Sequence, residues 1–228
     1  MPERMINMVK NIAIDGPAGA GKSTIAKLAA KKLGLIYVDT GAMYRAVGLY
    51  ILENNIDKDS EEEVSNAIKN INISIEYKEG KQIVLLNERD VNDLIRQEEV
   101  GNIASVTSAY PKVRELLLDT QRNLAKKRSV IMDGRDIGTT VLPDAALKIY
   151  LTASVEKRAD RRYKQLKSQG TDADIEQIKK DIAQRDYQDM NREVSPLKQA
   201  DDAVYLDTSD MTIEVVVNEI LSLYGKVS

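Results

Sequence analysis

Eight residues near the start of the chain have the types and spacing of a phosphate-binding loop. Residues 16–23 read G-P-A-G-A-G-K-S and match the pattern G-x-x-x-x-G-K-[ST]. Glycines let backbone N–H groups approach phosphate oxygens, Lys22 can reach the β- and γ-phosphates, and Ser23 can bind a bridging Mg²⁺. A chain of this length matches by chance about once in a hundred sequences. The pattern predicts nucleoside triphosphate binding by the following residues: Gly16, Pro17, Ala18, Gly19, Ala20, Gly21, Lys22, Ser23 and Thr24.

The flanking segments place this loop between a strand and a helix. Residues 10–15 form a short apolar run that predicts a buried strand. Apolar residues at helical spacing follow the loop and predict a core-facing stripe: Ile25, Leu28, Ala29 and Leu33. Gly34 can end this helix, and the partial positive charge at its N-terminus favours phosphate. We expect Lys22 to be exposed in the loop, where it can meet the moving phosphoryl group.

Polar residues follow two further predicted strands. In open α/β sheets ligands collect beyond the carboxyl ends of strands, so Thr40 and Arg45, after residues 35–39, are placed to meet a substrate. The alternative is a helix cap and a solvated arginine. Asp133 follows the strand at residues 129–132, and we expect it to be the outer-sphere partner of Mg²⁺.

Two helical segments carry charged residues on one face each. The first runs from a Ser154 cap to Gly170 and the second begins near Asp174. Their charged triplets are Arg158, Arg161 and Arg162, and then Arg185, Asp189 and Arg192, while the second also offers an apolar face of Ile175, Ile178 and Ile182. Such runs are usually solvated faces. Two of them flanking a lid favour phosphate binding, because a kinase must shield and neutralise the transferred group.

The rest of the pattern alternates strands with helices, apart from one hairpin. Further strands are predicted at residues 147–151 and 203–207. Helices are predicted at about residues 44–51, at 98–108 and at 212–224. Two more helices are predicted to begin at the Ser60/Glu63 capping box and at Pro111. The hairpin pairs 73–77 with 82–86, and Val91 can add a third short strand. We interpret residues 41–110 as an insertion that carries substrate contacts, although it could equally serve packing alone. Arg114 lies beside the apolar stripe of its helix and can reach a cleft.

Composition narrows the classes of function. The chain has 43% hydrophobic and 30% charged residues, a net charge of −3, and neither Cys nor His. The absence of Cys and His excludes thiol and imidazole catalysis. The negative net charge gives no general affinity for nucleic acid or anionic membranes. The apolar runs are too short to span a membrane and the start does not resemble a signal peptide, so we expect a cytoplasmic protein. Met8 precedes the first strand, so the opening residues are either an unstructured tail or the result of a misassigned start at Met1.

Taken together, these motifs resemble those of the bacterial-type cytidylate kinases, which are P-loop nucleoside monophosphate kinases. The resemblance covers about residues 11–224 and rests on I-A-I-D-G-P-A-G-A-G-K-S-T, D-T-G-A-M-Y-R, Y-P-K-V-R, D-G-R-D-I-G-T, E-K-R-A-D-R-R and R-D-x-x-D-M-N-R. It implies a three-layer α/β fold with a five-stranded parallel sheet of order 2-3-1-4-5. It also implies a monophosphate-binding insertion at about 41–110 and a helical lid at about 155–191.

The resemblance also implies roles for individual residues. Arg45, Arg135 and Arg192 would hold the acceptor phosphate; Ser105, Arg114 and Asp136 would recognise cytosine, with Thr40 nearby; Arg185 and Asp189 would contact the ribose. The implied catalytic residues are Lys22, Arg135, Arg158, Arg162 and Arg192, of which Arg158 and Arg162 would be lid arginines facing ATP. Some members carry Ser where this chain has Thr40. This difference leaves the class of substrate unchanged and affects only fine preferences among substrates of that class. We expect a monomer that uses ATP, CMP or dCMP, and Mg²⁺.

Several alternatives remain open at this stage. The acceptor could be UMP, dTMP or shikimate, or the chain could be a nucleotide-binding regulator without activity. A GTPase switch is disfavoured because the chain contains neither D-x-x-G nor N-K-x-D. A nucleic-acid motor is disfavoured by the acidic charge balance.

Overall fold

The computed structural model describes residues 9–227 and has a five-stranded parallel sheet at its centre. The strands are β1 (Ile12–Asp15), β2 (Ile36–Asp39), β6 (Val130–Gly134), β7 (Leu147–Thr152) and β8 (Val204–Asp207). Their order across the sheet is β2-β6-β1-β7-β8, which in chain order is the predicted 2-3-1-4-5. The alternative starts Met1 and Met8 lie outside the described residues.

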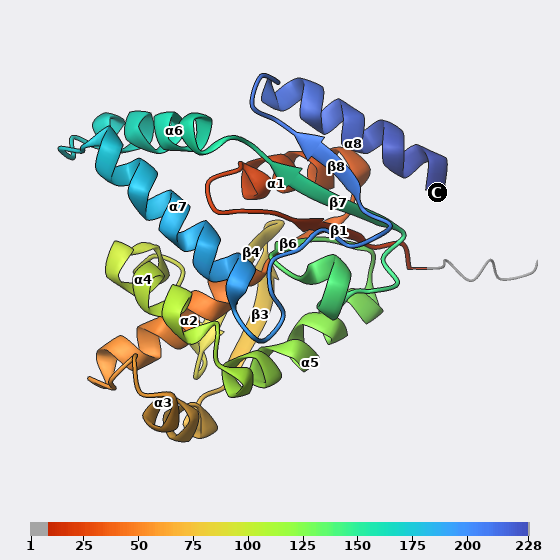
Figure 1. The fold of residues 1–228 in the computed structure, drawn as a ribbon. Coiled ribbons are helices and arrows are strands. Elements are labelled where there is room, and N and C mark those ends of the chain that lie inside the picture. Colours follow the sequence, from red (N-terminus) through yellow and green to blue (C-terminus); the bar gives the residue numbers. More distant parts are fainter. Residues whose placement is uncertain (1–8, 228) are drawn as a thin grey trace, which may run out of the picture.

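Helices cover both faces of this sheet. Helices α1 (Lys22–Leu33) and α8 (Ile213–Val227) lie on one face, and α5 (Pro111–Lys127) lies on the other (Figure 1). Successive strand residues point to opposite faces, so Ile12 and Ile14 pack in the cluster with α1 and α8. Ala13 joins the cluster on the α5 side. The α/β fold and the three layers are therefore confirmed.

The core-facing stripe of α1 differs from the prediction at one position. Ile25 and Ala29 are buried as expected, but Leu28 is 42% exposed. Ala26 and Ala30 are buried in its place. These small residues shift the buried face by part of a turn, because they let α1 lie close to the sheet and α8.

The segment between β2 and α5 has a hydrophobic core of its own. It contains α2 (Thr40–Glu53), α3 (Glu61–Ala67), α4 (Glu98–Thr107), two 3₁₀ turns (Ile68–Asn70 and Leu94–Arg96) and an antiparallel sheet of β3 (Ile73–Lys78), β4 (Lys81–Leu86) and β5 (Arg89–Asp90). The third strand was expected at Val91, which instead is buried just after it. Helix α2 begins at Thr40, earlier than the predicted 44, because the Asp39 carboxylate accepts from Ala42 N–H at 3.0 Å and caps the helix.

The small sheet is joined to the edge strand β2 by side chains. Gln82 on β4 accepts from Asp39 N–H at 2.8 Å and donates to Asp39 C=O at 3.1 Å. The Tyr77 hydroxyl donates to Tyr37 C=O at 3.2 Å. An edge strand exposes unpaired backbone groups, and these side chains satisfy part of that edge.

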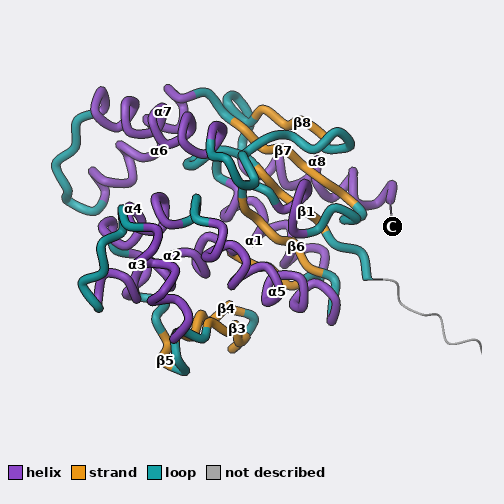
Figure 2. The backbone as a smooth tube through the Cα atoms, turned by 60° about the horizontal axis from the view of Figure 1, so that its bottom comes forward, coloured by secondary structure: helices purple, strands orange, loops and turns teal. Residues whose placement is uncertain are grey.

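Helices α6 (Val155–Ser168) and α7 (Ile175–Asn191) pack against each other and lie across from the α2–α4 region (Figure 2). The isoleucines expected to be buried in α7 are only half-buried. The buried residues of α7 are Asp186 and Asp189. The inner face of α7 is therefore polar, because it meets arginines rather than an apolar layer. Within residues 9–227, no helix is both long and apolar enough for a membrane span.

Candidate active site

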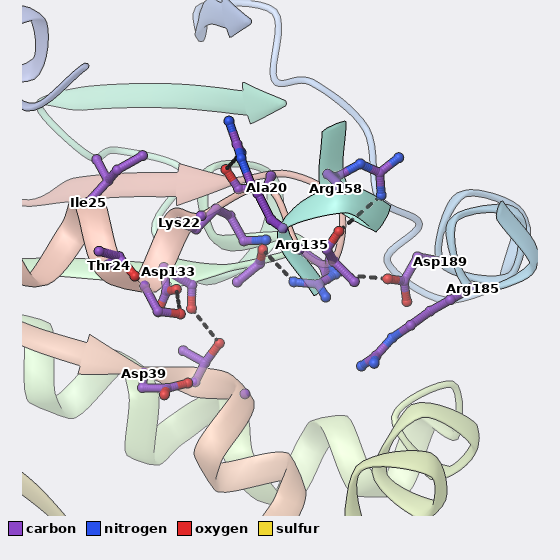
Figure 3. A pocket seen from close by; sticks show the side chains of 18 of the residues that line it. Ala20, Lys22, Thr24, Ile25, Asp39, Asp133, Arg135, Arg158, Arg185 and Asp189 are labelled. Atoms are coloured by element: carbon purple, nitrogen blue, oxygen red, sulfur yellow. Dashed lines mark hydrogen bonds and ion pairs between the residues drawn. The ribbon is translucent and has the colours of Figure 1, made fainter. Parts of the chain in front are cut away.

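A cavity of about 730 Å³ opens at the carboxyl ends of the central strands. The phosphate loop, α2, α4, the loop after β6, α6 and α7 all contribute to its lining (Figure 3). Every residue predicted for the site lines this cavity except Gly16 and Pro17. Residues dispersed over the whole chain are therefore brought together, while their individual roles stay predictions.

The phosphate loop passes very close to strand β7. A Cβ added to Gly16 would lie 1.9 Å from the Leu151 carbonyl oxygen, and Gly16 has φ +148°. Only glycine fits a backbone crossing of this kind. The loop can thus turn into α1, whose N-terminus opens toward the cavity.

Lys22 is buried in this loop, contrary to the expectation that it would be exposed. Its side chain donates to the carbonyl oxygens of Gly16 and Pro17, each at 2.7 Å, and the residue is 6% exposed. Burial, together with the neighbouring Arg135, lowers the pKa of Lys22 to about 7. The ammonium is therefore held inside the loop, where an incoming phosphate would be an additional partner.

Ser23 and Asp133 are in direct contact beside the loop. The Ser23 hydroxyl donates to Asp133 Oδ2 at 2.7 Å, and the Tyr37 hydroxyl donates to Oδ1 at 3.0 Å. Burial and the nearby Asp39 raise the pKa of Asp133 to about 6. Thr40 donates to the Asp133 carbonyl at 2.8 Å and so joins the start of α2 to the end of β6. A hydroxyl and a carboxylate thus meet where the triphosphate is predicted to lie.

Arg135 is held by helix α7. Its Nε donates to Asp189 Oδ2 at 2.8 Å. Burial alone would raise the pKa of Asp189, but Arg135, Arg185 and Arg192 together outweigh it and keep that pKa below its usual value. In Figure 3 this pair lies beside Lys22, and Arg185 extends into the same cavity.

Three further arginines line the cavity with guanidinium groups whose hydrogen-bonding capacity the described residues do not fully use. Arg45 donates to Ile95 C=O at 3.2 Å and passes Gly101, where a Cβ would lie 2.6 Å from its guanidinium. Arg185 Nε and Arg192 Nη2 are buried without a hydrogen-bond partner among the described residues. Burial lowers the pKa of all three guanidinium groups, to about 10 for Arg185. An anion in the cavity would relieve both the unpaired donors and the mutual repulsion.

Arg114 and Asp136 form a buried pair at another part of the cavity. Arg114 Nη2 donates to Asp136 Oδ2, and its Nη1 donates to Ser108 C=O at 3.1 Å. Its guanidinium lies 5.6 Å from the ring centre of Tyr44. Ser105, on α4, lines the same cavity. The pair presents a donor and an acceptor side by side, which is the complement of a heteroaromatic edge.

Arg158 and Arg162, which lie on α6, each have an acidic partner. Arg158 donates to Asp186 on α7 and, at 2.9 Å, to Ala18 C=O in the phosphate loop. Arg162 lies 3.6 Å from Glu98 on α4 and donates to Gln165. Helix α6 therefore contacts both the phosphate loop and the α4 side of the cavity.

Some cavity residues escaped the sequence-based assignment. Arg161 donates to the carbonyl oxygens of Ala20 and Thr208, and its spacing from Arg158 was a usable signal. Arg96, in a 3₁₀ turn, lies 3.8 Å from Asp39 and gave no such signal. The other such lining residues are Asp39, Gly41, Tyr44, Ala104, Ser108, Gly134, Gln165, Thr208, Met211, Thr212, Ile213 and Val216. Thr208, Met211, Thr212 and Ile213 follow β8, so the rule that ligands gather beyond the carboxyl ends of strands could have identified them.

Comparisons with known proteins agree with this arrangement. The family model described as Cytidylate kinase matches residues 12–226. A cytidylate kinase from Caldicellulosiruptor saccharolyticus is 53% identical over 217 residues, covering 95% of this chain and 96% of that protein. One from Bacillus cereus is 51% identical with the same coverage. An uncharacterized protein from Eubacterium ventriosum, with a solved structure, shares the fold at a TM-score of 0.51 and 10% identity, covering 95% of this chain and 98% of that one. The chain belongs to the cytidylate kinase family.

Proposed function

We propose that the protein transfers the γ-phosphoryl group of ATP to CMP or dCMP, giving ADP and CDP or dCDP. The observation that carries this proposal is the pair of buried guanidinium nitrogens that lack a hydrogen-bond partner among the described residues, Arg185 Nε and Arg192 Nη2, in a cavity that also contains the phosphate loop. Buried donors without partners are costly, so their retention indicates a ligand that satisfies them. A nucleotide supplies acceptor oxygens on its phosphate and its ribose.

The donor nucleotide would bind at the phosphate loop. Residues 16–24 would surround its phosphates, with Lys22 contacting the β- and γ-phosphates. Arg158 and Arg162 would approach from the lid, and Arg158 already contacts Ala18. Transfer would then occur between the loop and the buried arginines.

Magnesium fits the oxygen ligands at this point. Mg²⁺ keeps several waters and binds through few protein groups plus phosphates, and here the Ser23 hydroxyl lies 2.7 Å from the Asp133 carboxylate. Within the described residues, no cluster of three or more acidic groups competes for it. When bound, the ion would neutralise charge on the β- and γ-phosphates, with Ser23 as an inner ligand and Asp133 in the outer sphere.

The acceptor phosphate would be held by Arg45, Arg135 and Arg192. Guanidinium groups bind phosphate through paired donors and stay charged at every physiological pH. A phosphate dianion would also offset the mutual repulsion that contributes to the lowered pKa values of Arg45 and Arg192. Arg185 and Asp189 would contact the ribose.

Cytosine would be recognised at the Arg114–Asp136 pair, with Ser105 and Thr40 nearby. Cytosine offers a donor at N4 beside an acceptor at N3, whereas uracil offers an acceptor at O4 beside a donor at N3. Asp136 accepts and Arg114 donates, and the two groups lie next to each other. They therefore match the cytosine edge and oppose the uracil edge.

The reaction would need no general base. An acceptor phosphate is already a nucleophile near neutral pH, which agrees with the absence of His. Lys22, Arg135, Arg158, Arg162 and Arg192 would act by positioning the phosphates and stabilising their charge. Residues 41–110 would serve as the monophosphate-binding insertion and residues 155–191 as the lid. A cytoplasmic monomer stays our expectation.

The test is a panel of acceptors with ATP and Mg²⁺, assayed by coupled ADP release. CMP and dCMP should be used efficiently, and UMP, dTMP and shikimate poorly. Asp136→Ala and Arg114→Met should each lower kcat/KM for CMP sharply while hardly lowering it for UMP, because unpaired polar groups discriminate by as much as roughly 10⁴ to 10⁵. Lys112→Met, an exposed change on the same helix, should alter neither value. Equal losses for CMP and UMP in both variants would contradict the assignment of this pair to the base.

A further inference from the structure

Asp15 is a buried carboxylate for which the proposed mechanism has no use. It ends strand β1, directly before Gly16, and is 5% exposed. Within residues 9–227 its hydrogen-bond donors are the backbone N–H groups of Ile137 and Gly138, each at 2.7 Å, and it forms no salt bridge. Burial raises the pKa of Asp15 to about 6. Because burying a carboxylate costs free energy, we expect Asp15 to have a function.

The two N–H groups begin a single π-helical turn, Ile137–Val141. The first N–H groups of any helical turn lack a partner within the turn. An aspartate at the preceding position commonly accepts from them, and here that position is occupied by Asp136. Yet the Asp136 side chain makes no such capping bond and bonds Arg114 instead. Asp15 therefore caps this turn in place of Asp136.

The rest of the turn is fixed from other elements. Arg122 on α5 donates to Thr140 C=O at 2.9 Å and to Val141 C=O at 3.2 Å. A Cβ added to Gly138 would lie 3.4 Å from Asp15 Oδ2 and 3.2 Å from the Lys148 side chain. The turn is thus held at both ends, and its N-terminal end depends on Asp15.

We propose that Asp15 is a positioning residue for acceptor recognition, which caps the turn at Ile137 and Gly138 and thereby leaves the Asp136 carboxylate free to recognise the base with Arg114. Without Asp15, the two N–H groups lose their acceptor and Asp136 is the nearest carboxylate in sequence that can replace it. Asp136 then leaves Arg114, and the base-reading pair is lost. Because Asp15 adjoins the phosphate loop, the same side chain ties the donor site to the acceptor site. This inference rests on the proposed role of Asp136 in base recognition.

The test combines kinetics with amide exchange on the full chain. Asp15→Asn and Asp15→Ala should lower the ratio of kcat/KM for CMP to that for UMP by at least about tenfold, the effect of losing one hydrogen bond to a charged group. The KM for CMP should rise more than the KM for ATP. In the free variants, the Ile137 and Gly138 amides should exchange faster by NMR. Asn11→Ala is the matched control, since Asn11 directly precedes the strand β1 that Asp15 ends. The Asn11 side chain accepts from Val130 N–H at 3.0 Å and donates to Ala125 C=O at 3.2 Å, and neither contact lies in the cavity.

A double-mutant cycle separates this inference from the proposed function. In the Asp136→Ala background, Asp15→Ala should lower the CMP-to-UMP ratio no further, because the group it positions is gone. If Asp15→Asn and Asp15→Ala lost stability like Asn11→Ala but kept the ratio, Asp15 would be merely structural and the inference overturned. If Asp136→Ala itself kept the ratio, the base assignment would fail first. Unchanged Ile137 and Gly138 exchange in the Asp15 variants would overturn the capping role alone.

Discussion

Arg158 on α6 donates to both carboxylate oxygens of Asp186 on α7, and the same guanidinium donates to Ala18 C=O in the phosphate loop. Both residues are buried. One side chain therefore joins α6 to α7 and to the loop that we propose binds the donor nucleotide.

Asp186→Asn should destabilise the protein by about 3 kcal/mol, because removing one partner leaves a buried guanidinium uncompensated. It should also raise the KM for ATP, since Arg158 would lose the group that orients it. Urea unfolding and initial-rate assays give the two quantities. Asp160→Asn, which breaks the exposed Lys164–Asp160 pair, should change stability by less than about 0.5 kcal/mol. Equal effects of the two substitutions would remove Asp186 from this role.

Lys22→Ala should reduce phosphoryl transfer by at least about 10² to 10³, because a preorganised charge next to the moving group would be lost. The fold should persist, since the ammonium is buried at a cost that alanine does not carry. Coupled ADP release and thermal unfolding measure the two effects. Lys31→Ala, on the exposed side of the same helix, is the control. Near-normal turnover in Lys22→Ala would contradict the assignment, and a matching loss of thermal stability would make Lys22 structural.

Closure of the lid predicts a change in hydrogen exchange. Amides of residues 155–191 should exchange more slowly when a bisubstrate analogue joins the donor and acceptor sites, because Arg158, Arg162 and Arg185 then gain phosphate or ribose partners. Amides of β1 and β6 serve as an internal reference, since these strands are buried with or without ligand. The lid assignment would have to be abandoned if protection in 155–191 did not change on saturation with the analogue.

Asp15 also predicts a pH dependence of stability. Its pKa is raised from 3.8 to about 6 in the folded state, so its stabilising contribution is complete below the unfolded pKa and is lost as pH rises through about 6. Between about pH 4 and pH 7 the unfolding free energy of the wild type should therefore fall relative to Asp15→Asn, by about 2 to 3 kcal/mol. Urea titrations across this range measure it. Asn11→Ala should differ from the wild type by a constant offset, and a pH-independent difference for Asp15→Asn would be evidence against the raised pKa.

The sequence by itself determined the phosphate loop, the strand and helix that flank it, and the motifs that carry the family resemblance. These features are local: residues 16–23 specify a backbone conformation, and runs such as residues 10–15 specify a buried strand. The arrangement of the sheet followed from the resemblance, and the structure has the same order. Most predicted site residues follow strands or lie on one helix face, so local rules could identify them.

Only the tertiary structure decided which groups are partners. Arg114 and Asp136 are 22 residues apart, and Asp15 and Ile137 are 122 apart, so no local period connects them. The sequence-based prediction was wrong in exposing Lys22 and burying Leu28, because the burial of both residues depends on how closely other segments approach α1 and its loop. Periodicity specifies which face of an element turns inward. The free energy of a buried charge depends on the donors and acceptors that the fold brings to it from elsewhere.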